Sequence, residues 1–140
     1  MAGGVFGNLE EWGGVLDRLE ELTGTGQLEQ HQDDLVRLLR YPDNWRLREA
    51  GLEAAATVGA PTTALVRQLL RLTMDRQLYH QARVLAAEAL GAAFERLRAN
   101  GQIEALHLQK EVGEQMRALL SESDVPVLHQ AVRRILPAVG

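Results

Sequence analysis

The chain has 140 residues, a net charge of −4, 46% hydrophobic residues and no cysteine, which is the size and apolar content of one globular domain. The absence of cysteine excludes disulfides, thiolate metal ligands and thiol nucleophiles. The aromatic share is only 4%, and Ala and Leu supply most of the apolar side chains, which favours helices over a β-sandwich rich in Val, Ile, Tyr and Phe.

Apolar spacing and helix-stop residues predict seven helices. The first runs from about Leu9 to Leu22, with Gly24 and Gly26 ending it. The second covers about 28–40 and stops before Tyr41-Pro42. Glycine and proline are the residues that most often follow a helix, so both ends are well marked.

The third and fourth helices are separated by Gly59 and Pro61. Asp43 or Asn44 is a suitable N-cap for the third, because a short polar side chain can accept a hydrogen bond from the first turn. The fourth follows Pro61 and ends near Asp75. Both carry apolar residues at helical spacing.

An unbroken apolar stripe over about 78–97 predicts the fifth helix, which closes at Asn100-Gly101. The sixth covers about 102–120, and the seventh follows a cap at Ser123 or Asp124, with Pro126 in its first turn. Connections of two to five residues make consecutive helices antiparallel. The prediction is a single domain over 1–140, with pairs at about 8–40, 43–74 and 77–120 and an unpaired last helix at 124–139.

The helical segments also repeat one another in sequence, which is typical of stacked repeat architectures. An Arg followed by small residues and a Glu occurs as Arg48 to Glu53 and as Arg83 to Glu88. The third and seventh helices match at an offset of 81 residues, which pairs Asp43 with Asp124, Leu47 with Leu128, Ala50 with Ala131, and Val58-Gly59 with Val139-Gly140.

These segments resemble the HEAT-repeat family of armadillo-like proteins, well over 43–140 and only in helix spacing over 8–40. The resemblance implies an all-α, right-handed α–α superhelix (a solenoid) of about seven helices in three and a half antiparallel pairs. It also implies a concave surface, lined by the second helix of each pair, that binds a partner. The sequence departs from the pattern at His129, which stands where Arg is expected, and in three extra residues between Asp75 and Arg83.

Two Arg residues and two Asp residues of these repeats are expected to be structural. Arg48 and Arg83 lie one repeat apart, and each helix that carries one follows an Asp, namely Asp43 or Asp75. Neighbouring repeats could link these residues into an Asp–Arg ladder.

No pattern of catalytic residues stands out. His107 and Glu111 share a helix face at i,i+4, but two ligands are too few for a metal site, and we interpret them as a solvated face. His-Glu dipeptides are absent, which argues against the iron-dependent hydroxylases of the family. No nucleophile elbow or Gly-rich phosphate loop occurs. We therefore predict a protein that is not an enzyme and needs neither metal nor cofactor.

Basic residues on the second helices are the candidate binding site. Residues 1–34 hold eight acids against Arg18, a balance of −7, whereas residues 35–98 hold ten Arg against six acids, a balance of +4. Arg suits carboxylates because its guanidinium is a planar fork. If the second helices lie side by side, a basic stripe results that could bind an acidic segment of another protein; the alternative is a solvated face. The stripe residues are Arg37, Arg40, Arg67, Arg71, Lys110 and Arg117.

The seventh helix has an apolar face without a polar capping helix after it, although terminal repeats usually need a polar outer face. Two alternatives stay open. Either the helix packs back on the sixth, or it is open to a partner or to a second copy of the chain, which would make a homo-oligomer. The residues concerned are Val127, Leu128, Ile135 and Leu136.

We predict a non-catalytic protein–protein interaction module, a scaffold or adaptor subunit. The amino terminus lacks the regions of a signal peptide, and no apolar run is long enough to cross a bilayer, so we expect a cytoplasmic protein that does not enter membranes. Two alternative classes follow from related short repeats. One is a nucleic-acid-binding HEAT-like protein, which the acidic net charge disfavours; the other is a bilin-lyase-like accessory protein.

Overall fold

The computed structural model describes residues 4–101, 104–122 and 126–139; the side chains of 104–106 and 136–139 lie outside that description. Within it the secondary structure is entirely helical. The elements are the 3-10 turns η1 (Gly4–Phe6) and η2 (Leu28–His31) and the α-helices α1 (Trp12–Thr25), α2 (Gln32–Arg40), α3 (Trp45–Ala55), α4 (Thr63–Met74), α5 (His80–Ala99), α6 (Glu104–Glu122) and α7 (Pro126–Val139).

The helix ends follow from local chemistry. The Asn44 side chain accepts a hydrogen bond from the Leu47 amide at the start of α3, and Thr62 does the same for Leu65 at the start of α4. Gly26 ends α1 in the left-handed conformation, at φ 73°, which other residues adopt only at a cost. The N-cap predicted at Ser123 or Asp124 lies outside the described residues.

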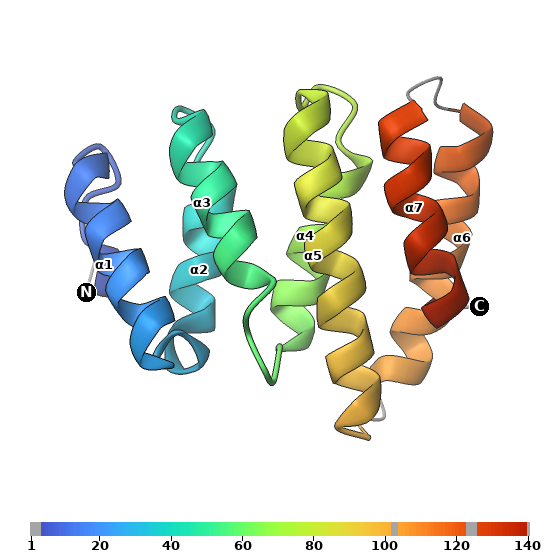
Figure 1. Ribbon diagram of the computed structural model, residues 1–140, viewed down its shortest axis with the longest axis horizontal. Coiled ribbons are helices and arrows are strands. Elements are labelled where there is room, and N and C mark those ends of the chain that lie inside the picture. Colours follow the sequence, from blue (N-terminus) through green and yellow to red (C-terminus); the bar gives the residue numbers. More distant parts are fainter. Residues whose placement is uncertain (1–3, 102–103, 123–125, 140) are drawn as a thin grey trace.

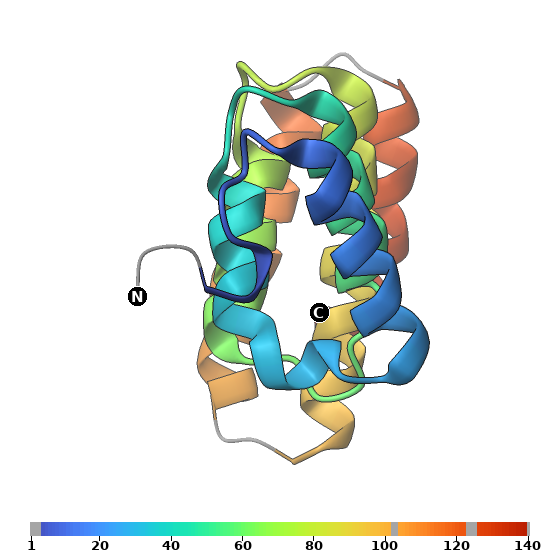
Figure 2. The same cartoon turned by 90° about the vertical axis from the view of Figure 1, so that its left-hand side faces the viewer.

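The helices stand in a row two layers deep (Figures 1 and 2). The odd-numbered helices lie side by side in one layer, and the even-numbered helices lie side by side in the other. All odd-numbered helices begin at the upper edge in Figure 1, and the even-numbered ones run the opposite way. Each helix thus packs on helices one or two places along the chain.

The core lies between the two layers. Its largest members are Leu side chains, Phe94 and Met116, and the Ala residues of α5 let the neighbouring helices approach closely. At Gly51 of α3 the backbone comes close to α2, because a Cβ atom there would lie 2.6 Å from Leu38 Cδ2 and 3.0 Å from Leu39 Cδ2. Glycine therefore allows the close α2–α3 packing, and a larger residue would displace the Leu38 and Leu39 side chains.

The last helix packs onto its own chain. It contacts both α6 and α5, and Leu128 and Ile135 are 0% and 2% exposed. These two side chains are not available to a second copy, so that part of the oligomer prediction is wrong; burying them against α5 satisfies their apolar surface inside the chain. Val127 is exposed, and the Leu136 side chain lies outside the described residues.

The expected Asp–Arg ladder is replaced by bonds from Arg to the backbone. Arg48, the fourth residue of α3, donates to the Tyr41 carbonyl at the end of α2, 3.0 Å away. Arg83, the fourth residue of α5, donates to the Thr73 carbonyl near the end of α4, 2.9 Å away. Burial lowers the pKa of the Arg83 guanidinium, and the nearby Asp75 partly offsets that effect. Each bond satisfies a carbonyl that its own helix leaves without a partner.

The same position in α7 holds His129. Its Nε2 atom is buried and has no hydrogen-bond partner among the described residues. Imidazole is shorter than the Arg side chain and cannot span the same distance to the preceding helix. The structure thus relates α3, α5 and α7 through one position, with α7 lacking the bond that the other two make.

Candidate functional site

The layer of even-numbered helices carries all six predicted basic residues, two each on α2, α4 and α6. Within each of α2 and α4 the two Arg residues lie three or four positions apart, which places them on one side of the helix. Because these helices lie next to one another (Figure 1), the residues share one layer of the protein. Their individual environments differ, and those differences decide what each can bind.

Arg37 and Arg40 of α2 are engaged inside the molecule. Arg37 is half-buried and donates from Nη2 to the Gly7 carbonyl at 2.8 Å, which ties the amino-terminal segment to α2. Arg40 donates from Nε to Oε1 of the buried Gln68 at 3.3 Å, which links α2 to α4. Arg37 is therefore a structural residue, while the exposed end of Arg40 still contributes positive charge to the surface.

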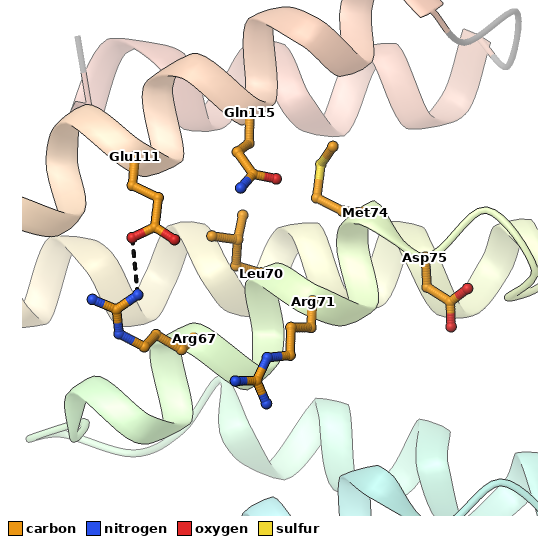
Figure 3. Close-up of a pocket in the computed structure, with 7 residues that line it drawn as sticks. All are labelled: Arg67, Leu70, Arg71, Met74, Asp75, Glu111 and Gln115. Carbon is orange, nitrogen blue, oxygen red and sulfur yellow. Dashed lines mark hydrogen bonds and ion pairs between the residues drawn. The ribbon is translucent and has the colours of Figure 1, made fainter.

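Arg67 of α4 forms an ion pair with Glu111 of α6, at 2.9 Å between Nη1 and Oε2 (Figure 3). Both side chains are partly exposed, so the pair adds little to the free energy of unfolding. Its consequence is geometric. The pair holds the guanidinium of Arg67 toward α6, and it closes one end of a groove between the two helices.

That groove has a volume of about 380 Å³ and is lined by residues of α4 and α6 and by Asp75, which follows α4. Leu70 and Met74 give it an apolar floor, and Gln115 offers an amide that can donate and accept hydrogen bonds (Figure 3). Five of the seven lining residues are charged or polar, so the groove is a mainly polar surface with a small apolar floor.

Arg71 is the basic residue of this groove that has no partner among the described residues. It is exposed, and it forms no hydrogen bond or ion pair with any other described residue. Figure 3 shows its side chain turned away from Glu111, whose carboxylate is already bonded to Arg67. All five N–H donors of its guanidinium are therefore open to an external carboxylate.

Lys110 and Arg117 extend the basic surface along α6. Both are exposed, and two turns separate them, which puts them on the same side of the helix. The six predicted residues therefore do not form one uniform stripe. Arg71 and Lys110 are open to a partner, Arg40 and Arg67 also link helices, and Arg37 is structural. Arg117 is exposed but already has an interaction within the protein.

The residues of α6 that complete the groove were not predicted from the sequence. Glu111 was interpreted only with His107, as a solvated pair, and Gln115 had no assigned role. The available signal was the combination of a basic i,i+4 pair on one helix with an acid on the second helix after it. Reading that signal requires knowing that α4 and α6 are neighbours.

Two other kinds of site are absent from the described ranges. No three His, Asp or Glu side chains in 4–101, 104–122 and 126–139 come together as metal ligands. Among the helices of the same ranges, none combines the length and hydropathy required to span a bilayer.

Comparison of the chain with protein-family models, with curated proteins and with solved structures gave no match.

Proposed function

We propose that this protein is a non-catalytic interaction module, a scaffold or adaptor, that binds an acidic segment of another protein across the α4–α6 groove. The observation that carries the proposal is the open guanidinium of Arg71 beside an apolar floor. An acidic residue of the partner would pair with Arg71, and an apolar neighbour would cover the partly buried Met74. Lys110 and the exposed end of Arg40 would attract the partner over longer distances.

The architecture we propose is a HEAT-like, right-handed α–α solenoid. Three observations support it: antiparallel neighbours, two layers of alternating helices, and the equivalent position of Arg48, Arg83 and His129. Such a row offers a long, continuous face to a partner because each repeat contacts only its neighbours. The groove lies on the layer formed by the second helices, where the resemblance places the binding surface.

A charge-reversal experiment tests the function. The probe is a fluorescein-labelled helical peptide with Glu at i,i+4 spacing among Leu residues, and its binding is followed by fluorescence anisotropy. We expect Arg71→Glu to weaken binding about tenfold or more, because it replaces an attraction with a repulsion. The matched control is Arg133→Glu, which makes the same charge change on an exposed residue of α7, in the other layer.

Two results would overturn the proposal. The first is equal affinity for a peptide in which Gln replaces every Glu, since the carboxylate would then not be recognised. The second is an equal loss of affinity in Arg133→Glu, since net charge alone would then explain binding. A duplex DNA oligomer that binds more tightly than the acidic peptide at low salt would instead favour the nucleic-acid class. Helical circular dichroism should be the same for all variants.

A further inference from the structure

The layer of odd-numbered helices carries a second and larger hollow, between α1 and α3, with a volume of about 610 Å³. The α1 wall includes Leu16, Leu19 and Glu20, and the α3 wall includes Ala50, Glu53 and Ala54. On each helix these residues lie three or four positions apart, so each wall is one continuous helix face. The hollow therefore runs along the seam between the two helices.

The seam is open because its α3 wall is built from small side chains. Packed helices lie about 8–10 Å apart, and Ala50 and Ala54 are too short to fill the space above the backbone. Leu16 is consequently only half-buried, although its neighbour Leu19 is buried. An apolar groove of this kind leaves Leu16 in contact with water unless another molecule covers it.

The rim of the groove is acidic. Glu20 projects from α1 and Glu53 from α3, and both are exposed. Neither forms an ion pair with any other residue of the described ranges. On α1 the only basic residue, Arg18, is bonded to Glu21 at 3.4 Å. The two rim carboxylates are therefore uncompensated on opposite sides of one apolar floor.

Two exposed tryptophans form a tryptophan lip at the upper end of the same seam. Trp12 and Trp45, the first residues of α1 and α3, are 41% and 61% exposed. The guanidinium of Arg46 lies between them, 5.8 Å from the Trp12 ring centroid and 6.0 Å from that of Trp45. The charge of Arg46 is thus held against the two rings, and it does not neutralise the acidic rim. Exposed Trp residues are among the side chains that contribute most to protein interfaces.

We propose that the α1–α3 groove binds a basic amphipathic helix of a partner protein. Apolar side chains of that helix would cover Leu16 and the Ala residues, Lys or Arg would pair with Glu20 and Glu53, and one further apolar residue would stack on the tryptophan lip. A helix is the matching shape because a groove along two parallel helices accepts a third element laid along it. The lining extends from Leu16 to Gly24 and from Ala50 to Thr57, which is about two turns on each wall.

This interaction is independent of the proposed function. It uses the opposite layer of the protein and recognises the opposite charge. A partner with both an acidic and a basic segment could engage the two surfaces together, but neither surface needs the other. Arg71→Glu should leave binding in the α1–α3 groove unchanged, and Glu20→Lys should leave binding of the acidic peptide unchanged, so the two proposals fail separately.

Intrinsic fluorescence tests the proposal directly, because the chain has only two tryptophans and both form the lip. The probe is an amphipathic helical peptide with Lys at i,i+4 spacing among Leu residues and without Trp. We expect a saturable change of tryptophan emission as the peptide is added. Glu20→Lys and Glu53→Lys should each weaken binding about tenfold, whereas Glu114→Lys, the same change on an exposed residue of α6, should not.

A second variant tests the groove without changing charge. Ala50→Leu places a larger apolar side chain at a half-buried position of the lining, so it should lower peptide affinity while preserving the helical circular dichroism. The proposal is overturned if emission does not change, if a Glu version of the peptide binds as tightly, or if Glu114→Lys loses as much affinity as Glu20→Lys. It is also overturned if sedimentation shows a dimer that Glu53→Lys dissociates, since the occupant would then be a second copy of this chain.

Discussion

Two seams of the same layer differ in how they are filled. Between α1 and α3 the structure leaves a hollow of about 610 Å³, and between α5 and α7 it leaves about 300 Å³. Both seams have small side chains on one wall, but at the second seam Ile135 of α7 reaches Gly91 of α5, where a Cβ atom would lie 3.2 Å from Ile135 Cγ1. The close approach of Ile135 to Gly91 narrows the second seam, whereas Leu16 of the first seam stays half-buried.

The largest expected effect comes from removing that large side chain. Ile135→Ala should lower the free energy of unfolding by about 2–5 kcal/mol, because Ile135 is buried and its loss leaves a cavity. Leu16→Ala, at the open seam, should cost less than about 1 kcal/mol, since its half-exposed side chain fills no enclosed space. Urea unfolding of both variants measures the difference. An equal loss of unfolding free energy in the two variants would mean that the α1–α3 seam is closed in solution.

Two glycine-to-alanine substitutions compare the close α2–α3 contact with the open surface of α1. Gly51→Ala should lower the free energy of unfolding by about 1–3 kcal/mol, because the new methyl meets the buried Leu38 and Leu39. Gly14→Ala adds a methyl into open space on α1 and should raise stability by up to about 1 kcal/mol through helix propensity. Thermal melting should shift in opposite directions for the two variants; a shift in the same direction would contradict the packing.

The contact between α6 and α7 can be strengthened at His129, which occupies the position that Arg48 has in α3 and Arg83 has in α5. His129→Arg should raise the free energy of unfolding by about 1 kcal/mol, because an Arg there can donate to a carbonyl at the end of α6, as Arg48 and Arg83 do for α2 and α4. His107→Arg, an exposed change on α6, is the control for added charge. A gain no larger than that of the control would show that the equivalence does not extend to α7.

The α3–α5 seam lies between the α1–α3 and α5–α7 seams. We expect Tyr79 to give this seam a smaller contribution to the free energy of unfolding, and that contribution depends on pH. The Tyr79 hydroxyl donates to Glu49 Oε2 at 2.7 Å. Burial, with that hydrogen bond and the charge of Glu49, raises the pKa of Tyr79 above its usual value of 10. The folded protein therefore keeps a phenolic proton that the unfolded chain loses, and the contribution of Tyr79 to stability falls as the pH rises beyond 10.

Tyr79→Phe removes this contribution. Urea unfolding of both proteins between about pH 8 and pH 11 should give curves that differ at pH 8 and converge as the pH rises. Curves that stay parallel over this range would mean that the hydroxyl does not bond to Glu49 in solution.

The sequence alone was sufficient for the order and approximate bounds of the helices, because apolar spacing, Asn44 and the glycines at 26 and 101 act locally. It also placed Arg67 and Arg71 on one helix face. It did not indicate that Arg48 and Arg83 bond to carbonyls, since the expected acceptor was a side chain. It left open whether Leu128 and Ile135 pack back on the sixth helix or stay exposed, and it did not indicate the contact of α7 with α5, which is two helices away in the chain.

The two grooves escaped prediction for the same physical reason. Each is formed by helices that are neighbours in a layer and not in the sequence, so its volume depends on which faces oppose each other. Ala50 and Ala54 predict an apolar helix face, but only the position of α1 shows that the face opens onto a hollow. Likewise, the role of Glu111 in the groove depends on its ion pair with Arg67, which lies 44 positions earlier in the chain.

The bonds from Arg48 and Arg83 to main-chain oxygens have a consequence for how such a chain can evolve. Every residue type offers the same carbonyl, so a substitution at an acceptor position keeps the acceptor atom, while the donor must remain. Correlated substitution between the two partners is then not expected, and a covariation search would overlook the link. A designer who adds a helix pair to this row needs to place one arginine and has no matching residue to choose.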